Sequence, residues 1–379
     1  MRRVAVAGVG LVKVSEHWEK PIGALFANAA LKAMKDAGTD EIDGLYVSNM
    51  SGAFMQEQLS MGALMADAIA KPGLHAVRVE AGSASGGVAF HEAVKAVASG
   101  YSDCVLIAGV EKMSDVLPEV VTKSLVMEEE QEYSAYTGVT KAGLSAMLHR
   151  LYIDLYAEPS DVGMMAVQSH ENAVGCRHAQ YPFRMSIERA MDSPMEADPI
   201  HMMECAGVGD GAAAILLVPA GAEGVEVAAT TVATDYCSLP MREDPLSLGS
   251  VEKAAEKAYR MAAVKPGDVD LVEVQDDFTI NGVLSLESLG LVERGKAAKL
   301  VAGGGAARDG ELPTNTFGGL KARGNPLGAT GVYQVAEVAL QLRGAAGDHQ
   351  VEDAEVGLTQ NMGGLGSTCA VAILRRLGR

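Results

Sequence analysis

The sequence predicts an α/β fold built from two similar halves. Residues 27–50 read as an Ala-rich helix, a polar turn and a strand, and residues 252–277 repeat that order. Residues 83–100 and 325–344 form a second pair, in which a glycine-rich helix start leads into an Ala/Val-rich helix that ends on a glycine. Because both plans occur twice, we expect a duplicated α/β unit with right-handed crossovers.

The strands of this unit are expected where short apolar runs flank the helices. The first lies in "MRRVAVAGVGLVKV" at residues 1–14, which lacks the cleavage pattern of a signal peptide and alternates as a buried strand does. Within it, "GVG" at 8–10 lacks the third glycine of a dinucleotide-binding motif and is interpreted as a turn after the strand. The strands after the two glycine-rich helices are expected at 104–109 and 370–375.

Residues of about 113–205 fit neither half, because they are rich in Met, Glu, His and Tyr. The Met side chains either fill gaps in a small core or form an adaptable surface facing a ligand. The expected domains are an N-terminal half at 1–112, a loop domain at 113–205, and a C-terminal half at 206–379.

Charge and composition exclude several classes of partner. The 31 Lys and Arg residues against 49 Asp and Glu give a formal charge of −18, which repels phosphate backbones and anionic membranes. Aromatic residues make up only 4%, and no apolar stretch is long enough to span a bilayer. We therefore expect no nucleic-acid and no membrane partner, and any anionic ligand must meet a local cluster of positive or amide groups.

Cysteine and histidine spacing gives no sign of a metal or a disulfide framework. The five cysteines are scattered without a CxxC pair, and three of the histidines lack metal-ligand spacing. A reducing, cytoplasmic location without a metal site is expected. The cysteines are Cys104, Cys176, Cys205, Cys237 and Cys369, and the histidines are His170, His178 and His201.

Four motifs occur in an order that resembles the thiolase superfamily, and in particular the archaeal thiolases and the sterol-carrier-protein type. They are "GVEKMSD" at 109–115, "DGAAA" at 210–214, "GGLKARGNPLGATG" at 318–331 and "NMGGLGSTC" at 361–369. The resemblance implies a thiolase fold, with duplicated βαβαβαββ halves in five layers around a central helix pair. It also implies that the inserted loop domain at 113–205 forms the CoA/acyl pocket. A homodimer or tetramer is implied as well.

The segment "VEAGSASGG" at 79–87 has the character of a nucleophile site. A helix start that is rich in small residues presents unpaired backbone N–H groups and the positive end of the helix dipole. The alternative is that these small residues only let two central helices pack closely. The resemblance implies that Ser83 stands where similar thiolases carry the acylated cysteine.

Four further positions depart from the thiolase pattern together with Ser83. By resemblance, Gln275 and Asp277 in "VQDDF" replace a histidine and a cysteine, while Asn325 and Gln360 each replace a histidine. A serine without a strong adjacent base does not ionise usefully, so a covalent acyl-enzyme on Ser83 is not expected. The changes occur in concert and are therefore interpreted as a rebuilt site.

The replacements suit chemistry on a thioester enolate. Gln275, Asn325 and Gln360 can donate hydrogen bonds to an oxyanion. The backbone N–H groups of Ser83, Gly363 and Gly364 are expected to supply further donors. In a dry pocket the pKa of Asp277 would be raised, which suits proton transfer. The adjacent Asp276 should point the opposite way.

The favoured hypothesis is retro-aldol cleavage of a β-hydroxyacyl-CoA, or the reverse condensation. In it Asp277 removes the hydroxyl proton and the amides hold the enolate. The resemblance includes such aldolases, often paired with a small zinc-ribbon/OB-fold protein. One alternative is a non-catalytic acyl-CoA-binding subunit that completes a hetero-oligomer with an active thiolase homologue. Another is ordinary thiolase turnover through an unrecognised nucleophile.

Coenzyme A is expected only as part of the substrate, with no permanently bound cofactor. Lys321 and Arg323 precede the glycine loop and are candidates to contact the CoA phosphates. Arg177 and Arg184 in the loop domain are weaker candidates.

Overall fold

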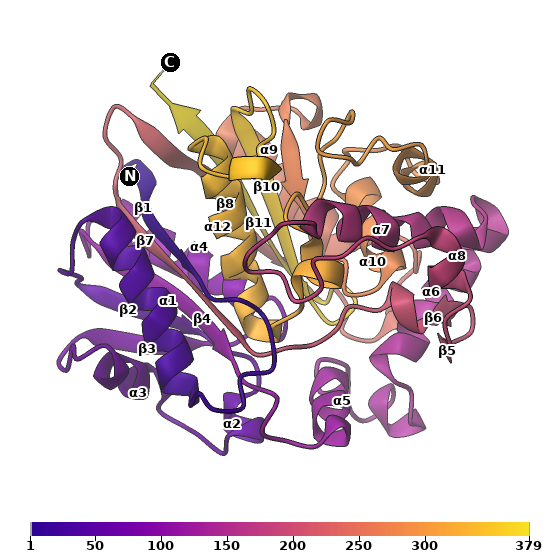
Figure 1. Cartoon of the computed structure of the whole chain (residues 1–379), viewed down its shortest axis with the longest axis horizontal. Coiled ribbons are helices and arrows are strands. Elements are labelled where there is room, and N and C mark those ends of the chain that lie inside the picture. The colour runs from indigo at the N-terminus through magenta and orange to yellow at the C-terminus, as the bar shows by residue number, and fades with distance from the viewer. Residues whose placement is uncertain (1, 379) are drawn as a thin grey trace.

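A mixed β-sheet forms the core of the computed structural model, which describes residues 2–378 (Figure 1). Within that range, nine strands form one sheet in the order β3-β2-β4-β7-β1-β8-β11-β10-β9, and β5 and β6 form a small separate sheet. The strands are β1 (Val4–Leu11), β2 (Gly44–Ser48), β3 (His75–Val79), β4 (Val105–Glu111), β5 (Met195–Ala197), β6 (Ile200–His201), β7 (Gly211–Pro219), β8 (Gly224–Thr234), β9 (Leu271–Glu273), β10 (Val356–Gly363) and β11 (Thr368–Leu377).

Strand pairing confirms the predicted duplication. In the first half β2 pairs in parallel with β4, β4 antiparallel with β7, and β7 antiparallel with β1. In the second half β9 pairs in parallel with β10, β10 antiparallel with β11, and β11 antiparallel with β8. The halves join where β1 pairs with β8.

Two sequence expectations about strands need correction. The strand that directly follows the second glycine-rich helix is β10, and the segment expected at 370–375 lies in β11, the counterpart of β7. The strand β7 lies beyond the expected boundary at 205, yet it completes the first half between β4 and β1. An apolar run reveals a strand, whereas its place in a sheet depends on distant partners.

The helices arrange the molecule in five layers. Helices α1 and α3 cover the outer face of the first half, α9 covers that of the second, and α4 and α12 lie between the halves and pack against strands of both. The helices are α1 (Ile22–Ala37), α2 (Gly52–Met55), α3 (Met61–Ala68), α4 (Ser85–Ser99), α5 (Pro118–Val126), α6 (Lys141–Leu155), α7 (Pro159–Ala173), α8 (Ile187–Met191), α9 (Gly249–Ala262), α10 (Thr279–Ser288), α11 (Ala297–Ala302) and α12 (Thr330–Leu342).

Strand β4 shows how the layers arise from the sequence. Its side chains alternate, so Val105 and Ile107 join the core around the central helices, while Leu106 and Ala108 join the core beneath α1 and α3. Both faces of the strand are buried, which explains why its sequence is continuously apolar.

Glycines allow close packing at two places in this core. Gly8 and Gly10 lie inside β1, not in a turn after it, and a Cβ on Gly10 would lie 2.1 Å from the Ala29 carbonyl oxygen of α1. In the central layer, a Cβ on Gly86 would lie 2.7 Å from the Gly331 nitrogen. The close-packing interpretation of the small residues is therefore correct for Gly86.

Replacing Gly331 by Ala is expected to destabilise the fold by about 1–3 kcal/mol, because overpacking forces backbone shifts. The new Cβ would lie 2.3 Å from both the Gly87 nitrogen and the Asn361 Oδ1 atom. Gly23→Ala in α1 is the matched control, since its Cβ would lie 3.5 Å from the nearest atom, the Ala68 Cβ. Thermal unfolding of both variants measures the effect, and equal unfolding temperatures would contradict it.

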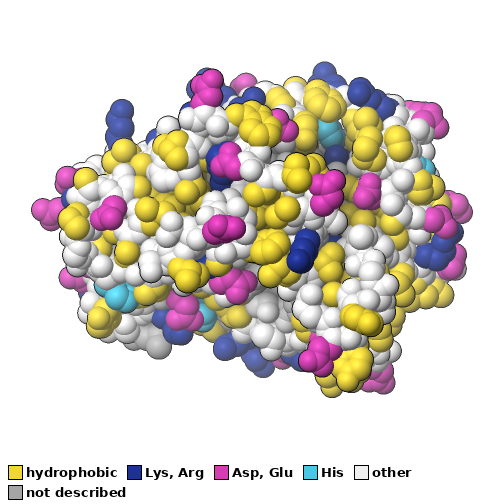
Figure 2. All heavy atoms as spheres, turned by 90° about the horizontal axis from the view of Figure 1, so that it is seen from below, with side chains coloured by type: hydrophobic (Ala, Val, Ile, Leu, Met, Phe, Trp, Pro, Cys, Tyr) yellow, Lys and Arg dark blue, Asp and Glu magenta, His cyan; other side chains and the backbone are white. Residues whose placement is uncertain are grey.

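The segment between the halves carries α5 to α8 with β5 and β6; of these, α6 to α8 and the two strands lie on the right of Figure 1, while α5 lies at its lower edge and packs against α2. On the face shown in Figure 2, acidic side chains are dispersed among apolar and basic ones. Among the described helices, none combines the length and apolar character needed to cross a bilayer.

Candidate active site

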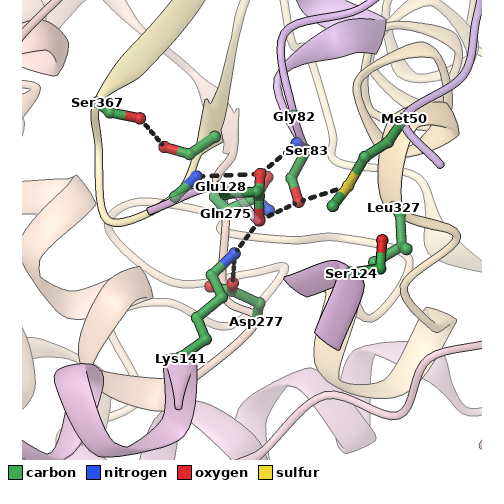
Figure 3. Close-up of polar contacts among 12 residues, drawn as sticks. Met50, Gly82, Ser83, Ser124, Glu128, Lys141, Gln275, Asp277, Leu327 and Ser367 are labelled. Atoms are coloured by element: carbon green, nitrogen blue, oxygen red, sulfur yellow. Dashed lines mark hydrogen bonds and ion pairs between the residues drawn. The ribbon is translucent and has the colours of Figure 1, made fainter. Parts of the chain in front are cut away.

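Ser83 lies in the turn before α4 and is fully buried. Its hydroxyl donates a hydrogen bond to Oε2 of Glu128 at 3.1 Å and lies 3.8 Å from the sulfur of Met50. Its backbone N–H donates to Oε1 of the same glutamate at 2.5 Å (Figure 3). A carboxylate is therefore the immediate partner of this serine, through both its side chain and its backbone.

Glu128 follows α5 and its carboxylate accepts four hydrogen bonds. Besides the two from Ser83, Oε1 accepts from the backbone N–H of Gly364 at 3.0 Å, and Oε2 accepts from the ammonium of Lys141 at 2.9 Å. Its side chain is only 3% exposed. This buried group is well satisfied as an anion.

Lys141 is the first residue of α6 and connects Glu128 to a second carboxylate. The side chain of the preceding Thr140 caps the helix by accepting from the N–H of Gly143 at 3.0 Å. The Lys141 Nζ lies 2.9 Å from Oδ2 of Asp277. Burial alone would lower the pKa of Lys141, but the charges of Asp277 and Glu128 outweigh it and raise the pKa above its ordinary value, so the lysine stays charged.

Asp277 lies between β9 and α10, and its surroundings differ from the expectation. Its Oδ1 accepts from the N–H of Phe278 at 3.2 Å and from Nδ2 of Asn281 at 2.8 Å, while Oδ2 faces Lys141. The expectation of a carboxylate desolvated in a dry pocket is wrong in this respect, because a buried cation faces it. We call Glu128, Lys141 and Asp277 together the charged row.

Asp276 points elsewhere, as expected for its position next to Asp277. Its carboxylate accepts from the Ser169 hydroxyl at 3.0 Å and from the Leu320 N–H at 2.6 Å. Burial raises the pKa of Asp276 to about 6. Asp277 is thus the member of the pair that faces Lys141.

Two of the predicted amide residues, Gln275 and Gln360, contact each other near Ser83, and Asn361 links Gln275 to Ser83. The Gln275 N–H donates to Oε1 of Gln360 at 2.8 Å, and Nδ2 of Asn361 donates to Oε1 of Gln275 and to the Ser83 carbonyl, both at 3.0 Å. Among the described residues, the amide nitrogens of both glutamines have no hydrogen-bond partner. Gln275 therefore has a free side-chain donor, Nε2, and Asn361 orients it by binding Oε1 of the same amide, whereas Gln360 binds the backbone of Gln275.

Two other predicted residues serve the backbone. Oδ1 of Asn325 accepts from the Leu327 N–H at 3.1 Å and from the Thr330 hydroxyl at 3.0 Å, so this side chain shapes the turn before α12. Of the two backbone donors predicted at 363–364, the N–H of Gly364 points at the Glu128 carboxylate, and that of Gly363 does not. Gly363 instead allows close approach, since a Cβ there would lie 2.7 Å from the Ala81 oxygen.

The charged row separates two pockets. Lys141 lines a pocket of about 790 Å³, and Glu128 lines another of about 540 Å³. The larger pocket is lined by Val121 and Leu125 of α5 and by residues 205–209, and also by Met202 and Phe278. The smaller pocket is lined by the turn before α4, including Gly82, and by the turn after β10, including Gly363 and Gly364. The larger pocket therefore reaches the charged row at Lys141.

Comparison with known proteins identifies the family of this chain. Residues 4–221 match the model of the "Thiolase, N-terminal domain", and residues 231–376 match the model of the "Thiolase C-terminal domain-like" family. The chain belongs to the thiolase family. The first match ends just after β7 and the second begins within β8, so the change from one family model to the other falls near the boundary between the halves that strand pairing shows.

Individual relatives agree with this assignment. An acetyl-CoA acetyltransferase of Methanothermobacter thermautotrophicus is 43% identical over 99% of this chain and 100% of its own length. The sterol carrier protein 2 of Gallus gallus is 28% identical over 98% of this chain and 71% of its own. A solved structure named "Ltp2-ChsH2(DUF35) aldolase" superposes with a TM-score of 0.85 at 22% identity, covering 99% of this chain and 98% of that one. These findings confirm a thiolase fold and support an enzyme.

The thiols of this thiolase-family chain are poorly suited to nucleophilic attack. Cys205 lines the larger pocket, and burial raises its pKa to about 12. Cys369 lies in β11, where burial raises its pKa well above the ordinary value. A thiolate is the reactive form of cysteine, so neither of these two thiols is activated for attack near neutral pH.

The basic residues predicted to contact CoA phosphates divide into two groups. The prediction that Arg323 contacts the CoA phosphates is wrong, because its fully buried guanidinium pairs with Glu337 at 3.2 Å. Lys321 is also buried, which lowers its pKa. Arg177 is exposed, and Arg184 is exposed and paired with a glutamate of α7. In the part of the chain that is described, no cluster of His, Cys, Asp and Glu could hold a metal.

Three residues of the site, Glu128, Lys141 and Asn361, are not among those that the sequence predicts. The motif "NMGG" did contain Asn361, but only the structure shows that it links Ser83 to Gln275. Lys141 carried a weak signal, since a lysine in the first turn opposes the helix dipole and needs a reason to be there. Glu128 lies in the acidic run "MEEEQE" at 127–132, where nothing distinguishes it from its neighbours.

Glu129 predicts a pH dependence of stability. It is buried, both its carboxylate oxygens lack a hydrogen-bond partner within residues 2–378, and burial raises its pKa to about 7. Because the pKa is raised in the folded state, the fold favours the neutral carboxyl group. The stability that Glu129 contributes is therefore fully present below about pH 4.5 and is lost as the pH rises through about 7.

Glu129→Gln should therefore unfold at a higher temperature than the wild type at pH 8 and at a similar temperature at pH 4.5. Each unit of pKa difference corresponds to about 1.4 kcal/mol, which sets the upper scale of the effect. Glu243→Gln, at an exposed position, is the control and should show no such pattern. A constant difference between wild type and Glu129→Gln across this pH range would contradict the prediction.

Proposed function

We propose that this thiolase-family enzyme makes or breaks a C–C bond next to a CoA thioester without forming an acyl-enzyme. The substrate class is a β-hydroxyacyl-CoA in the cleavage direction. One observation carries the proposal: the buried charged row ends beside Ser83 and reaches the larger pocket through Lys141. In such an arrangement the carboxylate can accept a proton, and the fixed cation beside it can stabilise a developing negative charge on the substrate.

The proposed cleavage begins at the β-hydroxyl of the substrate. Asp277 accepts the hydroxyl proton, the bond between the α- and β-carbons breaks, and an aldehyde or ketone is released. The electron pair passes to the thioester as an enolate, whose oxygen is stabilised by the Lys141 ammonium and by the free Nε2 donor of Gln275. The enolate then takes the proton back from Asp277 at its α-carbon, which yields the shorter acyl-CoA. Condensation is the reverse sequence.

Acyl transfer is less well supported, although the relative at 43% identity is named an acetyl-CoA acetyltransferase. Such a reaction on Ser83 needs a base that takes the proton from its hydroxyl. The one carboxylate in contact with that hydroxyl, among the described residues, already accepts four hydrogen bonds. The same carboxylate also occupies the backbone N–H groups of Ser83 and Gly364, which are therefore not free to stabilise the oxyanion of an acyl-transfer intermediate.

We further propose that the larger pocket admits the acyl end of the CoA ester, with Arg177 and Arg184 as candidate phosphate contacts. Coenzyme A enters only with the substrate. The aldolase of similar fold carries two component names, Ltp2 and ChsH2(DUF35), so a small partner protein of the zinc-ribbon/OB-fold kind is one expected form of the assembly. The other expected forms of the assembly are a homodimer or homotetramer of this chain and a complex with an active thiolase homologue.

Incubating the wild-type protein with a panel of β-hydroxyacyl-CoAs tests the function. Mass spectrometry should detect a carbonyl product and a shortened acyl-CoA in equal amounts. If the protein binds CoA esters but cleaves none of the panel in either direction, a non-catalytic subunit replaces the proposal. If it instead converts acetoacetyl-CoA and CoA into acetyl-CoA, ordinary thiolysis replaces it.

A further inference from the structure

Two backbone N–H groups from opposite halves of the molecule converge on one point. The Ser83 N–H, before α4, and the Gly364 N–H, after β10, both donate to Oε1 of Glu128, at 2.5 and 3.0 Å. Paired backbone donors of this kind form the oxyanion hole that acyl-transfer enzymes use for a tetrahedral intermediate. Here the oxygen in that position belongs to a side chain of the protein.

The Glu128 carboxylate is firmly held in this position. Its second oxygen accepts from the Ser83 hydroxyl at 3.1 Å and from Lys141 at 2.9 Å, and its side chain is 3% exposed. Figure 3 shows that these contacts come from separate segments that surround the carboxylate. A substrate oxygen could use the two N–H groups only by displacing a buried, ion-paired anion.

We propose that Glu128 determines reaction specificity by filling this oxyanion hole. It denies the thioester carbonyl the stabilisation that acyl transfer requires, while the charged row keeps its cation for an enolate. The inference rests on the proposed function, because it explains why the site favours C–C chemistry over acylation. It also makes a separate prediction about a thiol placed at position 83.

The test introduces a nucleophile at position 83, with and without the Glu128 carboxylate in the oxyanion hole. In Ser83→Cys, a thiolate at position 83 could attack the carbonyl of acetyl-CoA, so that a new C–S bond forms, the bond to CoA breaks, and the CoA thiolate leaves and takes a proton. Intact-mass spectrometry at pH 8.5 measures the rate of acetylation. The double variant Ser83→Cys/Glu128→Ala should acetylate at least about tenfold faster than Ser83→Cys, since removal of a single oxyanion-hole donor costs about 10²- to 10³-fold.

The control is Ser83→Cys/Glu129→Ala, which removes a neighbouring buried carboxylate that does not contact the two N–H groups. It should acetylate at the rate of Ser83→Cys. Equal rates for Ser83→Cys and Ser83→Cys/Glu128→Ala, whether both fast or both absent, would overturn the inference. Alkylation of each variant with iodoacetamide confirms that a folded, reachable thiol is present. Cleavage of β-hydroxyacyl-CoAs by the wild type is a separate readout, so a failure of the proposed function is distinguishable from a failure here.

Discussion

Replacing Asp277 by Asn is expected to lower kcat for β-hydroxyacyl-CoA cleavage by about 10²- to 10⁴-fold, the usual worth of a positioned general base. The amide keeps the size of the side chain and can still accept from Phe278 and Asn281, so the fold should persist. What is lost is the group that takes the hydroxyl proton. Steady-state kinetics on the best substrate of the panel measures the effect, with circular dichroism as a check on folding.

The neighbouring Asp276 provides the matched control. It is also buried, but it binds Ser169 and Leu320 and does not face the charged row. Asp276→Asn should therefore reduce kcat far less than Asp277→Asn. If Asp277→Asn kept activity within about threefold of the wild type, Asp277 would not be the base.

Replacing Lys141 by Met is expected to abolish activity and to destabilise the protein by about 3–5 kcal/mol. Removing one partner of a buried ion pair leaves an uncompensated charge, and here two buried carboxylates, Glu128 and Asp277, lose their shared cation. Chemical unfolding measured beside the kinetics would show both losses.

A background without the two charges separates these effects. In the Glu128→Gln/Asp277→Asn variant, the further change Lys141→Met should cost much less stability, because no buried anion remains to be compensated. Activity should stay absent in that background. An equal stability cost of Lys141→Met in both backgrounds would show that the lysine acts through packing alone.

Sequence patterns predicted much of the fold because the repeated elements are local. The glycine-rich helices, their terminal glycines and the continuously apolar β4 each follow from a few adjacent residues. The position of β7 in the first half and the order of β10 and β11 depend on pairing between distant segments, which no local pattern reports.

The candidate site divides in the same way. Ser83, Gln275 and Asp277 lie on motifs, so the sequence indicated them, and the structure brings them near one another through Asn361 and Lys141. Asn325 also lies on a motif, but its oxygen serves a turn. Glu128 and Lys141 come from the inserted segment, where charge patterns are typical of a solvated surface, and only tertiary packing shows that both are buried.

The most direct test of the account is the mass of the wild-type protein during turnover. A sample quenched while a β-hydroxyacyl-CoA is being cleaved should show carbonyl product accumulating and protein of unmodified mass. A protein species heavier by one acyl group, with the addition located on Ser83, would contradict a reaction that proceeds without an acyl-enzyme.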